Sequence, residues 1–125
     1  MSNPKILLVD DETRFRTTLS KRLKARGKDV VVLSSGEEAL QEIQKSDYDV
    51  VVLDVRMPGL DGLETLVTMK KVKPEMEIIL LTGHASLEAS KEGIGLGAFD
   101  YVLKPCDIDV LLEKIHKAYE RKAGP

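Results

Sequence analysis

The feature that most constrains the fold is a set of short, unbroken apolar runs separated by segments with helical spacing. Four runs, at residues 6–9, 30–33, 50–53 and 78–81, are rich in β-branched residues and have the length of a strand. A weaker run covers residues 101–103. Runs that do not alternate with polar residues are typical of parallel strands that are covered on both faces.

The segments between the runs carry apolar residues every three or four positions, which is the pattern of a helix that buries one face. Examples are Phe15, Leu19 and Leu23; Ala39, Leu40 and Ile43; Leu63, Leu66, Val67 and Met69; and Ile108, Leu111, Leu112, Ile115 and Tyr119. A strand followed by a helix, repeated along the chain, predicts a parallel sheet between two helical layers. We therefore expect an α/β, flavodoxin-like (βα)5 fold, a doubly wound five-stranded parallel sheet with strand order 2-1-3-4-5.

Several boundaries carry residues that start or stop helices. Ser35 and Glu38 have the spacing of a capping box, Gly27 can close the first helix, and Asp107 can cap the last one. Residues 93–98 have the glycine spacing of a dinucleotide fingerprint, but they follow a helix and precede a strand, which is the reverse of what phosphate binding needs. We interpret this segment as a helix stop and a loop.

Length and composition narrow the function classes. The 125 residues fit one domain, 1–125, with a core of about residues 4–121. A net charge of -2, from 19 basic and 21 acidic residues, provides no positive field for direct nucleic acid binding. The single cysteine excludes an internal disulfide, and no apolar stretch reaches the length of a membrane span. We expect a soluble, cytoplasmic protein.

Polar residues follow the predicted strands at their carboxyl ends, where open sheets of this kind bind ligands. Strand 1 is followed by Asp10, Asp11 and Glu12, strand 3 by Asp54, strand 4 by Thr82 and strand 5 by Lys104. Strands 1 and 3 are neighbours in the expected order, so the three aspartates converge. A hard divalent cation such as Mg²⁺ would relieve the repulsion between them.

An aspartate beside a metal ion and a lysine is suited to phosphoryl transfer, because both cations can neutralise charge on the phosphoryl oxygens. Asp54 is the expected nucleophile, since its carboxylate can attack phosphorus and give an acyl phosphate. Thr82 can donate a hydrogen bond to a phosphoryl oxygen, and Lys104 can pair with another.

These residues, together with residues 54–59, 82–85 and the pair Lys104 and Pro105, resemble the receiver domain of two-component response regulators over nearly the whole chain. The resemblance implies that Asp54 accepts a phosphoryl group from a phosphohistidine on a sensor histidine kinase or a phosphotransfer protein. It implies a Mg²⁺ or Mn²⁺ ion bound by Asp11, Asp54 and the backbone carbonyl of Arg56, with Asp10 acting partly through water.

The resemblance also implies a cis peptide bond between Lys104 and Pro105 and a switch that couples Thr82 to Tyr101. The switch would reshape the face of helix 4, strand 5 and helix 5, which controls an output partner or forms a homodimer. Cys106 departs from the bulky apolar residue that is common at its position. Arg56 and His84 occupy positions that tune the lifetime of the acyl phosphate in relatives.

Other readings of these residues remain open at this point. A haloacid-dehalogenase-like phosphatase needs an acid two residues after its nucleophile, where this chain has Arg56. A flavodoxin-like cofactor binder needs a hydroxyl-rich and glycine-rich loop where this chain has residues 10–12. A receiver that is never phosphorylated would act as an interaction module. Cys106 is either a small buried hydrophobe or a reactive thiol whose pKa is lowered by Lys104 and a helix N-terminus.

Overall fold

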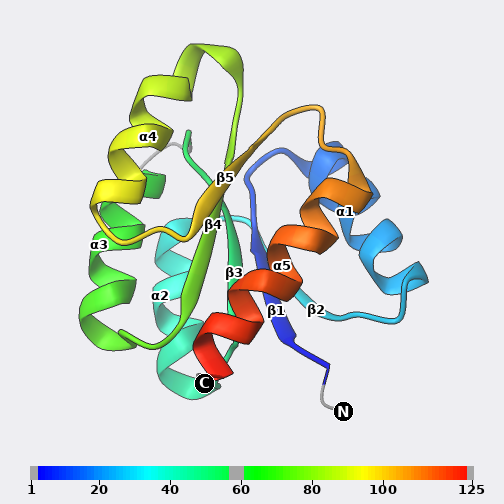
Figure 1. Cartoon of the computed structure of the whole chain (residues 1–125), viewed down its shortest axis with the longest axis horizontal. Coiled ribbons are helices and arrows are strands. Elements are labelled where there is room, and N and C mark those ends of the chain that lie inside the picture. Colours follow the sequence, from blue (N-terminus) through cyan, green and yellow to red (C-terminus); the bar gives the residue numbers. More distant parts are fainter. Residues whose placement is uncertain (1–2, 57–60, 124–125) are drawn as a thin grey trace.

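The computed structural model describes residues 3–56 and 61–123, and it has a parallel sheet at its centre (Figure 1). The strands pair in the order β2-β1-β3-β4-β5, all in parallel. Their bounds are β1 Lys5–Val9, β2 Asp29–Leu33, β3 Val50–Asp54, β4 Glu77–Thr82 and β5 Asp100–Leu103. The predicted fold class and strand order are therefore confirmed.

Helices cover both faces of the sheet. Their bounds are α1 Thr13–Ala25, α2 Gly36–Lys45, α3 Gly62–Val72, α4 Leu87–Gly95 and α5 Ile108–Ala123, and a short 3-10 helix η1 covers His84–Ser86. One core lies under α2, α3 and α4 and the other under α1 and α5, on opposite sides of the sheet in Figure 1. Alternate residues of one strand serve the two cores, such as Leu7 in the first and Leu8 in the second.

The register of the central strands brings their carboxyl ends to one edge. Val9 at the end of β1 lies opposite Leu53, and Asp54 at the end of β3 lies opposite Leu81. All residues of β3 are buried, as the unbroken apolar run predicted. The polar residues that follow these strands must therefore lie close together.

The first two helices end and begin largely as predicted. Gly27, just beyond α1, has a φ of 78°, a conformation that glycine adopts without strain. The Ser35 hydroxyl accepts a hydrogen bond from the Glu38 N–H at 3.1 Å and caps α2. The Glu38 carboxylate accepts from the Ser34 N–H at 2.9 Å instead of from Ser35. The capping box is therefore displaced by one residue in its second half.

The last two helices also have boundaries that the sequence predicted. The Asp107 carboxylate caps α5 by accepting from the Asp109 N–H at 2.8 Å. The segment 93–98 holds the end of α4, which stops at Gly95, and the loop that follows it. Glycine at position 93 lets α4 pack against β4, since a Cβ there would lie 2.5 Å from Leu80 Cδ1. The helix stops after this close approach, and Gly97 has a φ of 119°.

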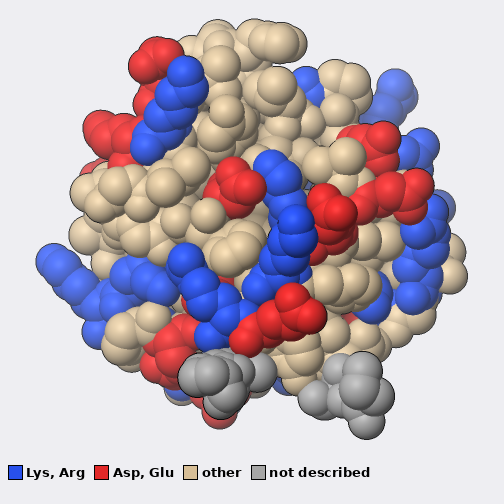
Figure 2. Space-filling model, viewed as in Figure 1, with Lys and Arg blue, Asp and Glu red and all other residues tan. Residues whose placement is uncertain are grey.

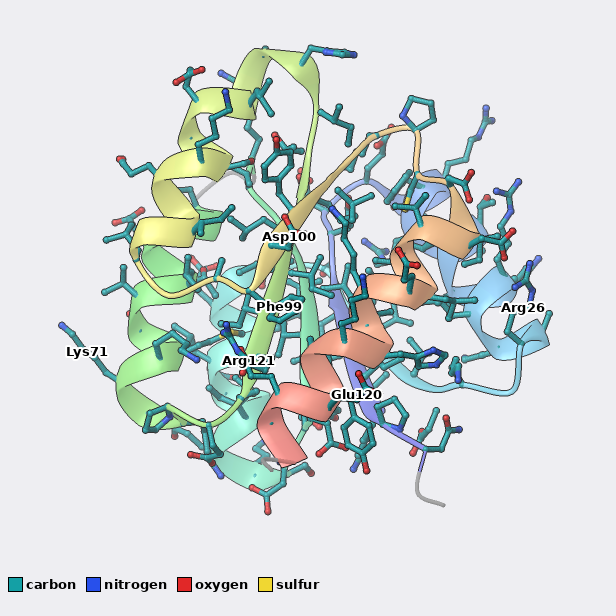
Figure 3. The ribbon with its side chains drawn as sticks, viewed as in Figure 1. Arg26, Lys71, Phe99, Asp100, Glu120 and Arg121 are labelled. Carbon is teal, nitrogen blue, oxygen red and sulfur yellow. The ribbon has the colours of Figure 1, made fainter. Side chains whose placement is uncertain are left out.

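The C-terminal end of α5 is attached to the start of β4 by an ion pair with a buried carboxylate. Arg121 donates from Nε and Nη2 to the two carboxylate oxygens of Glu77, each at 2.7 Å. Its guanidinium also lies over the ring of Phe99, 4.7 Å from the centroid (Figure 3). These contacts hold α5 against the sheet. Among the described residues, no helix is long and apolar enough to cross a membrane.

Candidate functional site

Three aspartates meet at the carboxyl edge of the sheet, as the sequence predicted. Asp10 follows β1, Asp54 ends β3, and Asp11 lies beside them. One carboxylate oxygen of each lies within 4.8 Å of those of the other two. Asp10 and Asp54 are buried, whereas Asp11 is exposed. Solvent therefore reaches the cluster at Asp11, whereas water screens the charges of the buried Asp10 and Asp54 carboxylates poorly.

Lys104 extends from the end of β5 into the same cluster. Its Nζ lies 2.8 Å from Asp10 Oδ2 and 3.5 Å from Asp54 Oδ2. Glu12 Oε1 lies 3.8 Å from the same nitrogen. Burial alone would lower the pKa of Lys104, but the contact with Asp10 and the charge of Asp54 outweigh it and raise that pKa. Lys104 is thus held in its charged form among carboxylates.

Asp54 is in surroundings that favour its protonated form. Burial raises the pKa of its carboxyl group to about 6, and the negative charge of Asp10 adds to the effect. Lys104 opposes this rise, as does the Arg56 N–H, which donates to Asp54 Oδ1 at 3.4 Å. The single lysine does not compensate the charge of the cluster. A further cation in the cluster would lower the pKa of Asp54, so that its carboxyl group would ionise at a lower pH.

The residues of the cluster fit a hard divalent metal ion. All three side chains offer carboxylate oxygens, the ligands that Mg²⁺ and Mn²⁺ prefer. Asp10 Oδ2 is buried, and among the residues that the structure describes its charge is met by the Lys104 ammonium, with Nζ at 2.8 Å. The metal role of the Arg56 carbonyl stays a prediction. Residues 57–59, the rest of that motif, lie outside the described residues.

Thr82 and Tyr101, the two residues of the predicted switch, lie on neighbouring strands. Thr82 is buried at the end of β4, and its hydroxyl donates to the Gly83 carbonyl at 3.0 Å. Tyr101 on β5 is half-buried and packs against the core under α2, α3 and α4. Lys114 of α5 donates to the Tyr101 carbonyl at 2.8 Å. Coupling between Thr82 and Tyr101 stays a prediction.

The loop that follows Lys104 holds one predicted feature and one correction. The peptide bond between Lys104 and Pro105 is cis. Burial, followed by the charge of Asp107, raises the pKa of the Cys106 thiol to about 11. The alternative in which Lys104 and a helix N-terminus lower that pKa is therefore wrong, because burial dominates. Cys106 packs against the core under α1 and α5 as a small apolar residue.

Neither histidine belongs to the group of described residues that could hold a metal ion. His84 is exposed in η1, and His116 is exposed on α5, with its Nε2 2.8 Å from Lys28 Nζ. Neither joins the acidic cluster. The effect of His84 on the lifetime of an acyl phosphate stays a prediction.

Two residues of α1 approach the site without having been predicted to do so. The ring of Phe15 lies under Lys104, with Nζ 4.3 Å from the ring centroid. Arg16 Nη1 donates to the backbone carbonyl of Asp10 at 2.7 Å. The sequence placed Phe15 on the apolar stripe of its helix. The available signal was its position three residues after Glu12, but this did not reveal the contact with Lys104, which lies in another loop.

Comparisons with known proteins agree with this geometry. The family model described as response regulator receiver domain matches residues 6–116. The transcriptional regulatory protein ZraR of Escherichia coli K12 is 36% identical over 116 residues, which are 93% of this chain and 26% of that protein. The DNA-binding transcriptional regulator NtrC of the same strain is 34% identical over 123 residues, 96% of this chain and 26% of that protein.

Solved structures are similar along their whole length. A Clostridium thermocellum receiver domain has a TM-score of 0.91 at 35% identity, and the match covers 96% of this chain and 97% of that one. The receiver domain of the Francisella response regulator 1452 has a TM-score of 0.86 at 35% identity, with 95% and 98% covered. The fold, the acidic cluster and these matches define a receiver domain of two-component signalling. The chain belongs to the response regulator receiver domain family, and it spans about a quarter of the length of ZraR and NtrC.

Proposed function

We propose that this chain receives a phosphoryl group on Asp54 from the phosphohistidine of a sensor histidine kinase or a phosphotransfer protein. The observation that carries the proposal is the position of the Asp54 carboxylate, within 4.8 Å of the carboxylates of Asp10 and Asp11 and 3.5 Å from the Lys104 ammonium. In the transfer, an Asp54 oxygen forms a bond to phosphorus. The P–N bond to the donor histidine breaks, and its electron pair stays on the imidazole.

The residues around Asp54 would divide the work of the transfer. Asp10, Asp11, Asp54 and the Arg56 carbonyl would hold Mg²⁺ or Mn²⁺, which would supply positive charge to the phosphoryl oxygens. Lys104 would move its ammonium toward a phosphoryl oxygen. The Thr82 hydroxyl would turn from the Gly83 carbonyl, to which it now donates at 3.0 Å, to another phosphoryl oxygen.

The signal would leave the site through Thr82 and Tyr101. A Thr82 side chain drawn toward the phosphoryl group would leave room for the half-buried Tyr101 ring to turn inward, so phosphorylation would shift the population between two states. The face formed by α4, β5 and α5 would change with it. Leu103 and Val110 expose apolar side chains there, 36% and 43% accessible, which suits contact with an output partner or a second copy.

The face formed by α4, β5 and α5 also carries charged side chains, which could contribute to contact with a partner. Figure 2 shows acidic and basic side chains next to one another on this side of the molecule, and Lys114 pairs with Asp100 at 3.0 Å. The domain would act in the cytoplasm, without direct binding to nucleic acid. It would comprise residues 1–125 and catalyse only its own phosphorylation and dephosphorylation.

The experiment that tests the proposal is intact-mass analysis after incubation with acetyl phosphate and Mg²⁺. The wild type should gain one phosphoryl group, and Asp54→Asn or added chelator should prevent the gain. A wild type that gains nothing would instead be an interaction module. Continued turnover of a phosphate ester would instead indicate a phosphatase, although Arg56 stands where such an enzyme needs an acid.

A further inference from the structure

Lys104 is surrounded by carboxylates that compete for its ammonium group. Asp10 lies 2.8 Å from Nζ, Asp54 3.5 Å and Glu12 3.8 Å. The Glu12 side chain is 63% exposed, whereas those of Asp10 and Asp54 are almost fully buried. A lysine has a flexible aliphatic stem and prefers water around its charge. If ion pairs were its only contacts, the Lys104 ammonium could therefore move outward with the exposed Glu12 carboxylate and leave Asp10 and Asp54.

The ring of Phe15 lies where it can prevent this movement. It comes from the first turns of α1, and its centroid is 4.3 Å from Lys104 Nζ, within the range of a cation–π interaction. The ring also packs against the core under α1 and α5, which fixes its orientation. The ammonium thus has an aromatic face on one side and the buried carboxylates beside it.

We infer that Phe15 is a positioning residue for the phosphoryl-transfer site, and that its ring holds the Lys104 ammonium beside Asp10 and Asp54. The inference rests on the proposed function, because Lys104 must contact the phosphoryl group for its position to affect the reaction. Phe15 would act through Lys104, over which its ring lies, and would take no part in the bond changes itself.

The surroundings of Phe15 allow its ring to be replaced without leaving a large cavity in the core. Phe15 is half-buried, and it lines an open groove of about 320 Å³ together with Thr18, Pro105 and Cys106. Phe15→Leu keeps an apolar side chain on the helix but removes the aromatic face. Phe15→Tyr keeps the face, and its hydroxyl can point into the groove.

The first test is an NMR measurement that does not depend on phosphorylation. Protons held over an aromatic face are shifted upfield, so the ε-methylene protons of Lys104 should resonate upfield of those of the other lysines. Lys104→Arg identifies the signal by its loss. Phe15→Leu should remove the upfield shift, and Phe15→Tyr should retain it. An unshifted Lys104 signal in the wild type would overturn the inference, even if Phe15→Leu and Phe15→Tyr failed to fold.

The second test is the rate of phosphoryl uptake from acetyl phosphate at fixed Mg²⁺. Phe15→Leu should lower the rate about fivefold, the size expected for losing one partly buried cation–π contact, and Phe15→Tyr should stay within about twofold of the wild type. The control is Leu19→Val, which alters a buried aliphatic residue one turn further along the same face of α1 and removes no aromatic ring. It should lower stability and leave the uptake rate unchanged.

Two outcomes of the uptake test would refute a positioning role. One is a Phe15→Leu rate equal to that of the wild type. The other is an equal loss in Phe15→Tyr or Leu19→Val, which would mean that Phe15 acts only through the stability of α1. A wild type that takes up no phosphoryl group would refute the proposed function instead, and the NMR shift would still decide whether Phe15 holds Lys104.

Discussion

The Asp54 carboxyl group lies in surroundings that oppose its own negative charge. Burial and Asp10 raise its pKa from 3.8 to about 6, so the folded state binds this proton more tightly than the unfolded state. Below about pH 4 both states hold the proton, and above about pH 6 neither does. The charged group therefore lowers the free energy of unfolding as the pH rises through this range. The buried charge costs stability, which is expected of a carboxylate that is kept for the proposed phosphoryl transfer.

Asp54→Asn should therefore stabilise the protein in the absence of divalent metal. At neutral pH with a chelator, the substitution should raise the free energy of unfolding by roughly 2 kcal/mol, the order expected from the pKa shift. The gain should shrink as the pH falls from 6 to 4, because the wild-type carboxyl group then becomes neutral too. Urea unfolding across this pH range measures the effect.

A control variant and the addition of Mg²⁺ make this test more specific. Glu120→Gln removes an exposed carboxylate on α5 (Figure 3) and should leave the free energy of unfolding nearly unchanged. Added Mg²⁺ should stabilise the wild type more than Asp54→Asn, because the metal site needs that carboxylate. An Asp54→Asn variant that is less stable than the wild type at neutral pH would contradict the account of the acidic cluster.

At the scale of elements, α3 begins in close contact with the end of β3. A Cβ on Gly62 would lie 2.2 Å from the Asp54 carbonyl oxygen and 2.6 Å from the Cα of Val55. Only a residue without a side chain allows this approach. The first turn of α3, capped by Asp61, therefore supports the backbone that carries Asp54.

Gly62→Ala should push α3 away from β3 and disturb the site. We expect a loss of about 2 kcal/mol in the free energy of unfolding, typical of overpacking, and slower phosphoryl uptake. The matched control is Gly95→Ala, since Gly95 is helical and an added methyl group there would meet no atom within 4 Å. That control should be neutral or stabilising by up to about 1 kcal/mol. Equal effects of the two variants would mean that close contact at Gly62 is unimportant.

The attachment of α5 to β4 gives a second prediction about elements. Glu77 is 6% exposed, so Arg121→Met would leave a buried carboxylate without its cation. We expect a loss of about 3 kcal/mol, measured by urea unfolding at neutral pH. Lys117→Met, which breaks an exposed pair on the same helix with its atoms 4.0 Å apart, should cost less than about 0.5 kcal/mol. Similar losses in the two variants would contradict a structural role for the buried pair.

The sequence predicted the bounds of those strands that are buried on both faces, because an unbroken apolar run of that length fits a buried parallel strand. Residues 6–9 and 50–53 form strands within one residue of their expected bounds, because a buried parallel strand cannot include polar residues in its middle. β4 also begins within one residue of its expected start, but the burial of Glu77 there was not predicted, since its partner Arg121 lies 44 residues away. Pairings of this kind depend on how the elements pack, which the local sequence does not express.

In the candidate site, too, some features could be predicted from the sequence and others depend on how the elements pack. Asp10, Asp11 and Asp54 were predicted to converge, because the ends of neighbouring parallel strands meet at one edge. The approach of Phe15 to Lys104 was not predicted, since a helical residue reaches the loop after β5 only once α1 is packed on the sheet. The sequence therefore predicts which strand ends carry chemistry, and the packing of helices decides what supports them.

At the scale of the whole molecule, the proposed function requires that a change at Asp54 becomes a change at the surface. The proposed route from Thr82 to Tyr101 crosses two adjacent strands, with Thr82 opposite Leu103 and Leu80 opposite Tyr101. We expect phosphorylation to shift the amide NMR signals of α4, β5 and α5. Thr82→Ala should still accept the phosphoryl group but should show much smaller shifts around Tyr101. Unchanged shifts in Thr82→Ala would contradict a role for this hydroxyl in the switch.

The central claim is that Asp54, and not one of its two acidic neighbours, carries the phosphoryl group. The most direct test is reduction of the phosphorylated protein with borohydride, which converts an aspartyl phosphate into homoserine, followed by peptide mass mapping. The account predicts homoserine at position 54 alone, in a reaction that needs Mg²⁺ and the phosphodonor. Homoserine at Asp10 or Asp11, or no reduced residue in a protein that has gained a phosphoryl group, would contradict it.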